Sequence, residues 1–360
     1  MSVSVSPLTA VALSGGVDSL VAAVLLKAAG SRLVAVHFLT GYESTAGPQT
    51  CLDRTRRLCA RLGLDLEVVD CRQTFQKEVV EPFAAAYRRG LTPNPCARCN
   101  PLIKFGPVLD HALALGADRL ATGHYARRTV DPEGRVHLYR GLDPVKEQSY
   151  FLARLTPGQL ARAVFPLGEL TKAEVIRMAT ASGVMPEPTP ESQDVCFVRQ
   201  QGYAAFLAAA GHVIPCPGPI VDVHGRTLGR HEGLHRFTVG QRQGINCPGP
   251  QPYYVVRLEP EANRLVVGSK SDILSGGCRV LDLNWIQPPP AGWFQAEVRL
   301  RYRSPACIAK VRADEQGATV LFNAPQAAVT PGQSAVFYQG AEVLGAGWIA
   351  ALDGSFSKGE

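Results

Sequence analysis

The chain has 360 residues, of which 46% are hydrophobic and 19% are charged. This composition excludes a globally disordered chain, and the length predicts two or three domains, each with its own core. The formal net charge of +6 is compatible with a polyanionic partner such as RNA and equally with an ordinary solvated surface.

Strand-like and helix-like segments alternate in the first half of the chain. Short apolar strands are predicted at residues 8–13, 32–38, 65–69 and 119–122, and helices at 19–29, 51–62 and 108–115. Such alternation is typical of an α/β layer built around a mostly parallel sheet. The first half therefore predicts an α/β fold.

The pattern changes after about residue 205, where β-branched and aromatic residues stand between Gly, Pro and Asn. Residues 253–258 and 264–268 flank a turn, which indicates a hairpin. Beyond the proline-rich segment 287–290, strands are predicted at 295–303, 307–312, 319–322, 335–338 and 343–349. Short strands separated by turns are typical of a small barrel. We predict an α/β catalytic domain over residues 1–205, a β-rich domain over 206–272 and a C-terminal β-barrel over 273–360.

Neither a secretion signal nor a membrane segment is predicted. The first seven residues lack a basic region followed by an apolar stretch, and no run approaches the roughly 18 apolar residues that span a bilayer. We therefore expect a cytoplasmic protein with no membrane partner. Ten cysteines in such a chain are expected to be reduced, metal-binding or catalytic, because disulfide frameworks belong mainly to small secreted domains.

The segment Ser14–Ser19 reads Ser-Gly-Gly-Val-Asp-Ser and lies between the first predicted strand and the first predicted helix. Gly15 and Gly16 permit a tight turn whose amides point at an anion near the positive end of the helix. Asp18 stands where a phosphate would bind, which requires a bridging cation such as Mg²⁺. The Gly-Lys-Ser/Thr ending of a Walker loop is missing. The alternative is an ordinary glycine turn that caps a helix.

This string resembles the PP-loop of the N-type ATP pyrophosphatases. The resemblance implies cleavage of ATP between its α and β phosphates, release of pyrophosphate and transfer of AMP to a substrate oxygen. The loop indicates the reaction type and leaves the substrate open.

Three cysteines stand in distinctive contexts. Cys96 and Cys99 form a Cys-x-x-Cys pair after Thr-Pro-Asn-Pro, and Cys196 precedes Phe197. The spacing lets two sulfurs share a metal or exchange a disulfide, and a structural zinc site would need two more ligands. The other cysteines are interpreted as structural: Cys51, Cys59, Cys71, Cys216, Cys247, Cys278 and Cys307.

Strings in the same order along about residues 8–350 resemble the tRNA-specific 2-thiouridylases, which make 2-thiouridine at the tRNA wobble position. They lie at residues 92–105, 121–127, 146–152, 196–197, 229–233, 238–244, 301–303 and 328–336. The resemblance implies a tRNA-uridine 2-sulfurtransferase. Such an enzyme adenylates O2 of uridine 34 with ATP and Mg²⁺, then transfers sulfur to C2 with release of AMP.

The resemblance also implies residue roles. ATP would bind at Ala12, Leu13, Ser14, Gly15, Gly16, Val17, Asp18, Ser19, Leu39 and Gly123. Lysine, glutamate and glutamine tRNAs would bind at His124, Lys146, Glu147, Gln148, Arg301, Tyr302 and Gln333. A partner protein would supply sulfur as a persulfide to Cys196, and Cys99 would be the nucleophile that helps to release it.

The chain departs from some members of that family at Cys96, where they have an aspartate. Cys96, Cys99 and Cys196 together could instead hold a 4Fe-4S cluster with one open iron. Persulfide chemistry and cluster chemistry both remain open at this point. In the persulfide reading, both reactive thiols are expected to be partly exposed and to have a lowered pKa, because the thiolate is the reactive form.

Two other functions compete with tRNA thiolation. One is a PP-loop enzyme that adenylates a small metabolite, as argininosuccinate synthetases do, and it would need none of the three cysteines. The other is a non-catalytic RNA-binding adaptor with a decayed ATP loop. The intact Ser14–Ser19 string and the Cys96/Cys99 pair speak against the adaptor.

Overall fold

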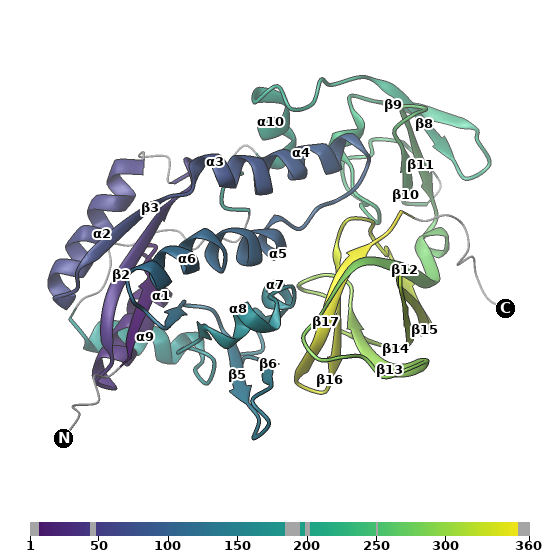
Figure 1. The fold of residues 1–360 in the computed structure, drawn as a ribbon. Coiled ribbons are helices and arrows are strands. Elements are labelled where there is room, and N and C mark those ends of the chain that lie inside the picture. The colour runs from purple at the N-terminus through teal and green to yellow at the C-terminus, as the bar shows by residue number, and fades with distance from the viewer. Residues whose placement is uncertain (1–6, 44–47, 184–194, 199–201, 250, 352–360) are drawn as a thin grey trace, which may run out of the picture. The chain divides into compact units, whose positions relative to one another are not determined.

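The computed structural model describes residues 7–43, 48–183, 195–198, 202–249 and 251–351. The chain forms two compact units (Figure 1). Unit 1 consists of Met1–Val79, Cys96–Phe197 and Ala341–Val343, and unit 2 of Val80–Pro95, Val198–Gly340 and Leu344–Glu360. Each unit has its own hydrophobic cores.

Unit 1 is built on a five-stranded parallel sheet with the strand order β3-β2-β1-β4-β7. The strands are β1 Leu8–Ala12, β2 Arg32–Leu39, β3 Leu66–Asp70, β4 Arg119–Ala121 and β7 Ala163–Val164. The strand order reverses direction at β1, which has β2 on one side and β4 on the other. Ligands of open α/β sheets bind at such a switch point, beyond the carboxyl ends of the strands.

The helices of unit 1 connect these strands. They are α1 Val17–Ala28, α2 Pro48–Leu62, α3 Arg72–Phe75, α5 Pro95–Cys99, α6 Pro107–Ala114, α7 Ser149–Leu152, α8 Pro157–Ala161 and α9 Lys172–Ala181. Side chains of β1, α1 and α2 form one core, and α1 packs against α9 in a second core. The apolar residues of α1 therefore hold the start of this helix firmly against the sheet.

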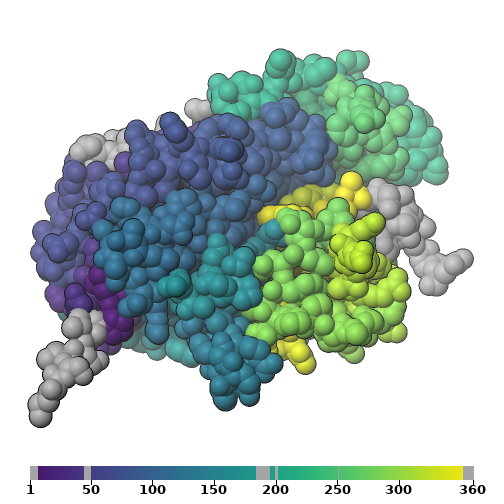
Figure 2. Space-filling model, in the orientation of Figure 1, coloured from purple at the N-terminus to yellow at the C-terminus, as the bar shows by residue number. Residues whose placement is uncertain are grey.

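A hairpin of β5 Ala126–Val130 and β6 Val136–Arg140 follows β4. It projects from the surface of unit 1 (Figure 2), and residues 342–343 pair with β6. Two π-helical turns, Gln76–Val80 and Asn100–Lys104, interrupt the helices around α4 and α5. The sequence pattern predicted neither the hairpin nor the π-turns, although the two strands of the hairpin pair with each other over a short stretch of chain.

Unit 2 contains a four-stranded sheet with the order β10-β11-β8-β9. Its strands are β8 Gly218–Asp222, β9 Thr227–His231, β10 Tyr254–Glu259 and β11 Arg264–Gly268, and helices α4 Glu81–Arg88 and α10 Gly202–Ala209 belong to the same unit. The predicted hairpin of β10 and β11 is confirmed. Ile220, Phe237, Ile245, Val255 and Leu265 fill the core beneath this sheet.

Six further strands of unit 2 close into a barrel, because β12 pairs with both β15 and β17. They are β12 Leu274–Trp285, β13 Trp293–Arg299, β14 Cys307–Asp314, β15 Gly317–Ala327, β16 Ser334–Gln339 and β17 Glu342–Ile349. Alternate residues point inward, as Ala309 and Val311 do on β14. The predicted class, an α/β domain followed by a β-rich domain and a barrel, is confirmed.

Two details of the barrel differ from the sequence prediction. The strand predicted at 295–303 ends at Arg299, and the chain then turns so that the Ser304 amide donates to the Arg301 carbonyl at 3.2 Å. Strand β12 was not predicted, because Gly276, Gly277 and exposed positions interrupt its alternation. No helix among the described residues is long and apolar enough to cross a membrane.

The barrel core provides a test of the fold. Phe337 is fully buried and stacks on Trp285 with ring centroids 5.2 Å apart. We expect Phe337→Ala to lower the free energy of unfolding by about 3–5 kcal/mol, because it removes buried apolar surface and leaves a cavity. Urea unfolding followed by tryptophan fluorescence measures this loss. Leu321→Ala, on a barrel residue with 40% exposure, is the control and should change stability by less than about 1 kcal/mol.

Candidate functional site

The predicted phosphate loop lies at the switch point of the sheet in unit 1. It leaves the end of β1 after Ala12 and Leu13, which are buried, and enters α1, whose N-cap is Gly16. Gly15 has φ +78°, and a Cβ atom there would lie 3.3 Å from Cδ of Arg54. Leu39, the residue expected near adenine, ends the neighbouring strand β2. The loop therefore has the backbone geometry expected for an anion cradle.

Side chains from the loop and from β2 stabilise this shape. Ser19 Oγ accepts a hydrogen bond from the Ser14 amide at 3.2 Å and donates one to the Gly16 carbonyl at 3.0 Å. His37, only 3% exposed, donates from Nδ1 to the Leu13 carbonyl at 2.8 Å. Ser19 thus supports the loop from within, and His37 anchors its first residue to the sheet.

Asp18 has two partners that the sequence did not reveal. Its Oδ1 accepts a hydrogen bond from the Tyr125 hydroxyl at 2.8 Å and lies 2.6 Å from Nζ of Lys172. Lys172 is the first residue of α9, whose start is marked by a capping box between Thr171 and Glu174. The capping box predicts a helix start from sequence, but only the fold brings that start to the phosphate loop.

Gly123 follows β4 and lies directly against the phosphate loop. A Cβ atom at this position would lie 2.8 Å from the carbonyl carbon of Asp18 and 2.8 Å from the amide nitrogen of Ser19. Real Cβ atoms do not approach backbone this closely, so the close contact requires glycine. The structure therefore brings two sequence-predicted ATP segments, Ser14–Ser19 and Gly123, into contact.

His124 connects the loop region to a lysine. Its Nδ1 accepts from the Thr122 hydroxyl or donates to it at 2.7 Å, and its Nε2 lies 3.3 Å from Nζ of Lys104. Burial, followed by the positive charge of Lys104, holds the pKa of His124 well below its usual value. The imidazole is therefore neutral at physiological pH, which suits Nε2 as the acceptor of a Lys104 proton.

The three predicted cysteines all belong to unit 1. Cys96 and Cys99 lie on α5, and Cys196 lies in the described segment 195–198. Cys96 and Cys196 each raise the pKa of the Cys99 thiol through their charge, so the three sulfurs are electrostatic neighbours. Buried Cys71 also belongs to this group, which the sequence interpretation as a structural residue did not anticipate.

The expectation of lowered thiol pKa values is wrong. Burial raises the pKa of Cys99 to about 12 and that of Cys196 to about 11, and it also raises the pKa of Cys96. Lys104 lowers all three, but its charge does not outweigh the loss of solvation. Cys196 is exposed as a residue and Cys99 is partly exposed, so both can be reached although neither is ionised at neutral pH.

Phe197 anchors the segment that carries Cys196. Its ring packs edge-on against Phe75 and Tyr42 with centroids 5.8 Å apart in each pair, and Tyr42 in turn lies 5.9 Å from Phe75. The Tyr42 hydroxyl donates to Oε1 of Gln76 at 2.8 Å. Since Phe197 is 1% exposed, this aromatic cluster holds the residue next to Cys196 in a buried socket.

The predicted tRNA contacts fall into two groups. Lys146, Glu147 and Gln148 precede α7 in unit 1, where Glu147 is buried and Oε1 of Gln148 accepts from the Tyr125 amide at 3.0 Å. Arg301, Tyr302 and Gln333 lie in unit 2. Their role in binding tRNA stays a prediction.

Arg301 and Gln333 make hydrogen bonds within unit 2. Nη2 of Arg301 donates to the carbonyls of Ala328 at 2.6 Å and Val239 at 3.1 Å. Nε2 of Gln333 donates to the Thr92 carbonyl at 3.0 Å. These bonds connect the barrel to the segment around Val239 and to the chain before α5.

Substitution of Gly123 tests whether the phosphate loop binds ATP. We expect Gly123→Ala to displace the loop at a cost of about 1–3 kcal/mol, since the added methyl group meets backbone atoms. ATP affinity, measured by calorimetry, should fall by about tenfold or more. Gly158→Ala is the control, because its Cβ would meet only Oγ1 of Thr156, at 4.0 Å. Unchanged ATP affinity in Gly123→Ala would contradict the assignment.

Substitution of Phe197 tests the aromatic anchor. In a Cys96→Ser background, a mild thiol oxidant should join Cys99 to Cys196, and Phe197→Leu should slow this reaction on the order of tenfold because the segment is less well positioned. Mass spectrometry of the peptide pair follows the disulfide. Phe83→Leu removes an equally buried ring from unit 2 and should leave the rate unchanged. Equal rates in all three proteins would show that Phe197 does not position Cys196.

Three family models match the chain. Residues 8–200 match a tRNA methyl transferase HUP domain, residues 205–269 a tRNA methyl transferase PRC-barrel domain, and residues 275–349 an aminomethyltransferase β-barrel domain. The first of these matches covers more than half of the chain.

Curated relatives match over nearly the full length. The chain is 51% identical to the tRNA-specific 2-thiouridylase MnmA of Desulfosudis oleivorans over 97% of this chain and 96% of that one. It is 43% identical to the corresponding protein of Trichlorobacter lovleyi over 95% and 97% of the two chains. Among solved structures, the U34-tRNA thiolase NcsA of Methanococcus maripaludis is 22% identical, with a TM-score of 0.37, over 53% of this chain and 62% of that one. On its sequence identity to these curated relatives, the chain belongs to the tRNA-specific 2-thiouridylase family.

Proposed function

We propose that this protein is a tRNA-uridine 2-sulfurtransferase that uses ATP to thiolate C2 of the wobble uridine. One observation carries the proposal: a series of contacts leads from the phosphate loop to Lys104, and the charge of Lys104 acts on the three thiols. Gly123 lies against Asp18 and Ser19, its neighbour His124 contacts Lys104, and Lys104 acts electrostatically on Cys96, Cys99 and Cys196. An activated substrate oxygen and a sulfur source are therefore close together in one unit.

The loop residues account for the first half of the reaction. Uridine O2 attacks the α phosphorus of ATP. The bond from this phosphorus to the oxygen that bridges it to the β phosphate breaks, and pyrophosphate leaves. Amides of Ser14–Ser19 and the ammonium of Lys172 would stabilise the negative charge that develops on the phosphates. Asp18 offers one carboxylate, which suits Mg²⁺ because this ion takes most of its other ligands from phosphates and water. When bound, Mg²⁺ would neutralise charge on the departing pyrophosphate.

The thiols account for the second half. A donor protein would load Cys196 as a persulfide, whose terminal sulfur attacks C2 of the adenylated uridine while AMP leaves. The thiolate of Cys99 would then attack Sγ of Cys196. The bond between Sγ of Cys196 and the transferred sulfur breaks, a Cys99–Cys196 disulfide forms, and the sulfur stays on C2 with the electron pair of the broken bond. Because the pKa of Cys99 is raised to about 12, this step needs a proton acceptor or a nearby cation, and Lys104 is the cation closest in electrostatic effect.

A 4Fe-4S cluster on Cys96, Cys99 and Cys196 is the other sulfur chemistry open to this site. In the part of the chain that the structure describes, no three Cys, His, Asp or Glu residues converge at the distances that a metal requires. We therefore derive no step through a cluster. Persulfide transfer needs only pairwise approach of Cys99 and Cys196.

The partners follow from this chemistry. We propose the lysine, glutamate and glutamine tRNAs as substrates, a persulfide-carrying protein as sulfur donor and the cytoplasm as location. We propose that residues 1–205 form the catalytic domain, that residues 206–272 form the central β-rich domain, and that residues 273–360 form a barrel that contacts tRNA. Family membership favours this function over the metabolite-synthetase and adaptor alternatives.

Cysteine substitutions separate the two halves of the reaction. With ATP, Mg²⁺, a persulfide donor and unmodified glutamate tRNA, we expect Cys196→Ser to release pyrophosphate at a rate near that of the wild type. Formation of 2-thiouridine should fall by about a thousandfold or more, because the sulfur carrier is lost. Pyrophosphate assay and nucleoside mass spectrometry measure the two steps.

Two results would contradict this mechanism. Normal thiolation by Cys196→Ser would remove that residue from the sulfur path. Thiolation that depends on iron and sulfide in anaerobically purified protein, and fails with a persulfide donor, would replace the persulfide route with a cluster. Cys59→Ser is the control, because this buried thiol lies in the core formed with α1 and should not affect either step.

A further inference from the structure

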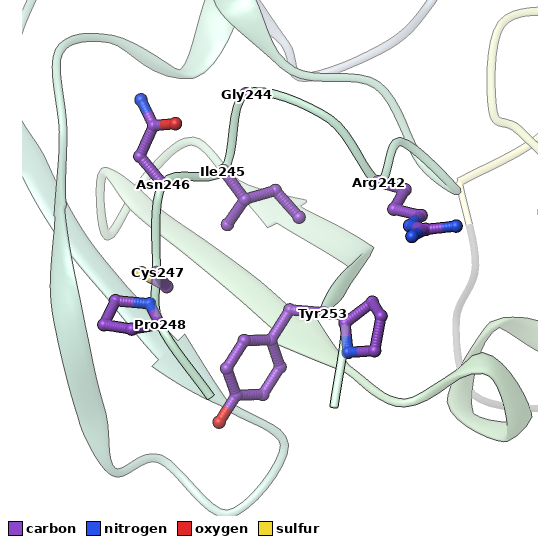
Figure 3. A pocket seen from close by; sticks show the side chains of 8 residues that line it. Arg242, Gly244, Ile245, Asn246, Cys247, Pro248 and Tyr253 are labelled. Carbon is purple, nitrogen blue, oxygen red and sulfur yellow. The ribbon is translucent and has the colours of Figure 1, made fainter. Parts of the chain in front are cut away.

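A pocket opens on the four-stranded domain of unit 2, and none of the residues that line it was given a catalytic or binding role from the sequence. It has a volume of about 290 Å³ and is lined by Arg242, Gly244, Ile245, Asn246, Cys247, Pro248, Pro252 and Tyr253. Figure 3 shows Arg242, Asn246 and Tyr253 around the hollow. The string 238–244 was singled out by resemblance alone, and neither ATP binding nor sulfur transfer explains it.

Backbone bonds hold the loop that forms this pocket. The Gly240 amide donates to the Val255 carbonyl at 2.8 Å, and the Val255 amide donates to the Gln241 carbonyl at 2.9 Å. Oε1 of Gln241 accepts from the Thr238 amide at 3.0 Å, and Nε2 donates to the Gln243 carbonyl at 2.8 Å. These hydrogen bonds join the loop to β10, so the backbone that carries Arg242 is held in place.

The polar groups of the pocket are available to a ligand. Within the described ranges, the side chains of Arg242 and Asn246 make no hydrogen bond or ion pair. Some other arginines of the same domain are paired, such as Arg226 with Asp222 at 3.1 Å and Arg257 with Glu259 at 2.8 Å. The positive charge of Arg242 is thus uncompensated, next to an aromatic ring and an exposed amide.

The pocket loop is also continuous with the surface predicted to contact tRNA. Nη2 of Arg301 donates to the Val239 carbonyl, three residues before Arg242. Gly240 has φ +84°, and a Cβ there would lie 2.2 Å from Cβ of Ala328 on the barrel side of the contact. The loop therefore contacts Arg301 at Val239 and lines the pocket from Arg242 onward.

We propose that this pocket is a nucleotide-binding subsite for the tRNA substrate, with a phosphate on Arg242 and a base stacked on Tyr253. Arginine recognises phosphate without reading sequence, and aromatic rings bind unstacked bases of any identity. Asn246 offers an amide for hydrogen bonds to the base or sugar. The subsite would position the tRNA body and take no part in the chemistry. This inference rests on tRNA being the substrate.

Substitutions at the two ends of the pocket test the proposal in the full chain. Unmodified glutamate tRNA is the probe, and fluorescence anisotropy at several salt concentrations measures binding. Arg242→Ala should weaken binding and reduce the slope of log affinity against log salt by about 1, because one phosphate contact is lost. Tyr253→Leu should weaken binding about fivefold or more, and Tyr253→Phe should restore it, since stacking needs only the ring.

Activity measurements distinguish a binding subsite from a structural role. The KM for tRNA should rise in Arg242→Ala and Tyr253→Leu, while kcat at saturating tRNA stays within about twofold of the wild type. Arg226→Ala is the charge-matched control, because this arginine is exposed and already paired with Asp222. Its tRNA affinity and salt slope should match those of the wild type.

Several outcomes would overturn the proposal. Unchanged affinity in both pocket variants, or an equal loss in Arg226→Ala, would show that the pocket does not bind tRNA. Saturable, Arg242-dependent binding of AMP would identify a free-nucleotide site instead. A defect seen only with the persulfide donor protein, and absent with a low-molecular-weight persulfide, would assign the pocket to that protein. Failure of the wild type to bind tRNA at all would contradict the proposed function itself.

Discussion

The close approach of Gly123 to the backbone of Asp18 and Ser19 is the constraint on which the site in unit 1 depends. It fixes the carboxyl end of β4 against the phosphate loop at the end of β1, so the two strands that flank the switch point present one continuous surface. His124, the next residue, then reaches Lys104, and Lys104 influences the thiols. The position of His124 and Lys104 beside the phosphate loop therefore depends on a contact that permits no side chain at residue 123.

The ionisable groups of this site are held in unreactive protonation states or in ion pairs. Lys172 and Tyr125 engage Asp18, so the carboxylate next to the phosphates carries its countercharge before any ligand arrives. Burial keeps the thiols of Cys99 and Cys196 protonated and His124 neutral. A protonated thiol reacts slowly with stray oxidants even where, as at Cys196, the residue is exposed, because the thiolate is the reactive form.

Unit 2 holds polar side chains in fixed positions, and we assign none of its residues to the chemical steps. The barrel holds Arg301 and Gln333 in hydrogen bonds to carbonyl groups, and the bond from Arg301 to the Val239 carbonyl reaches the loop that carries Arg242. A rigid loop with one unpaired arginine and one aromatic ring offers a pre-formed contact for a flexible polyanion. Binding energy from such a remote contact can be used to orient the uridine at the site in unit 1.

The sequence by itself determined the fold class, most strands and helices, and the phosphate loop, because these depend on local periodicity and on glycines at fixed spacing. Resemblance along the chain supplied the substrate and the three cysteines, but their expected low pKa values were wrong, since burial is a property of packing. Only the tertiary structure brought Lys172, Tyr125, Lys104 and the ring of Phe197 to the site. Lys172 and Tyr125 lie more than a hundred residues from Asp18, and Phe197 lies as far from Phe75, so sequence spacing carries no information about these contacts.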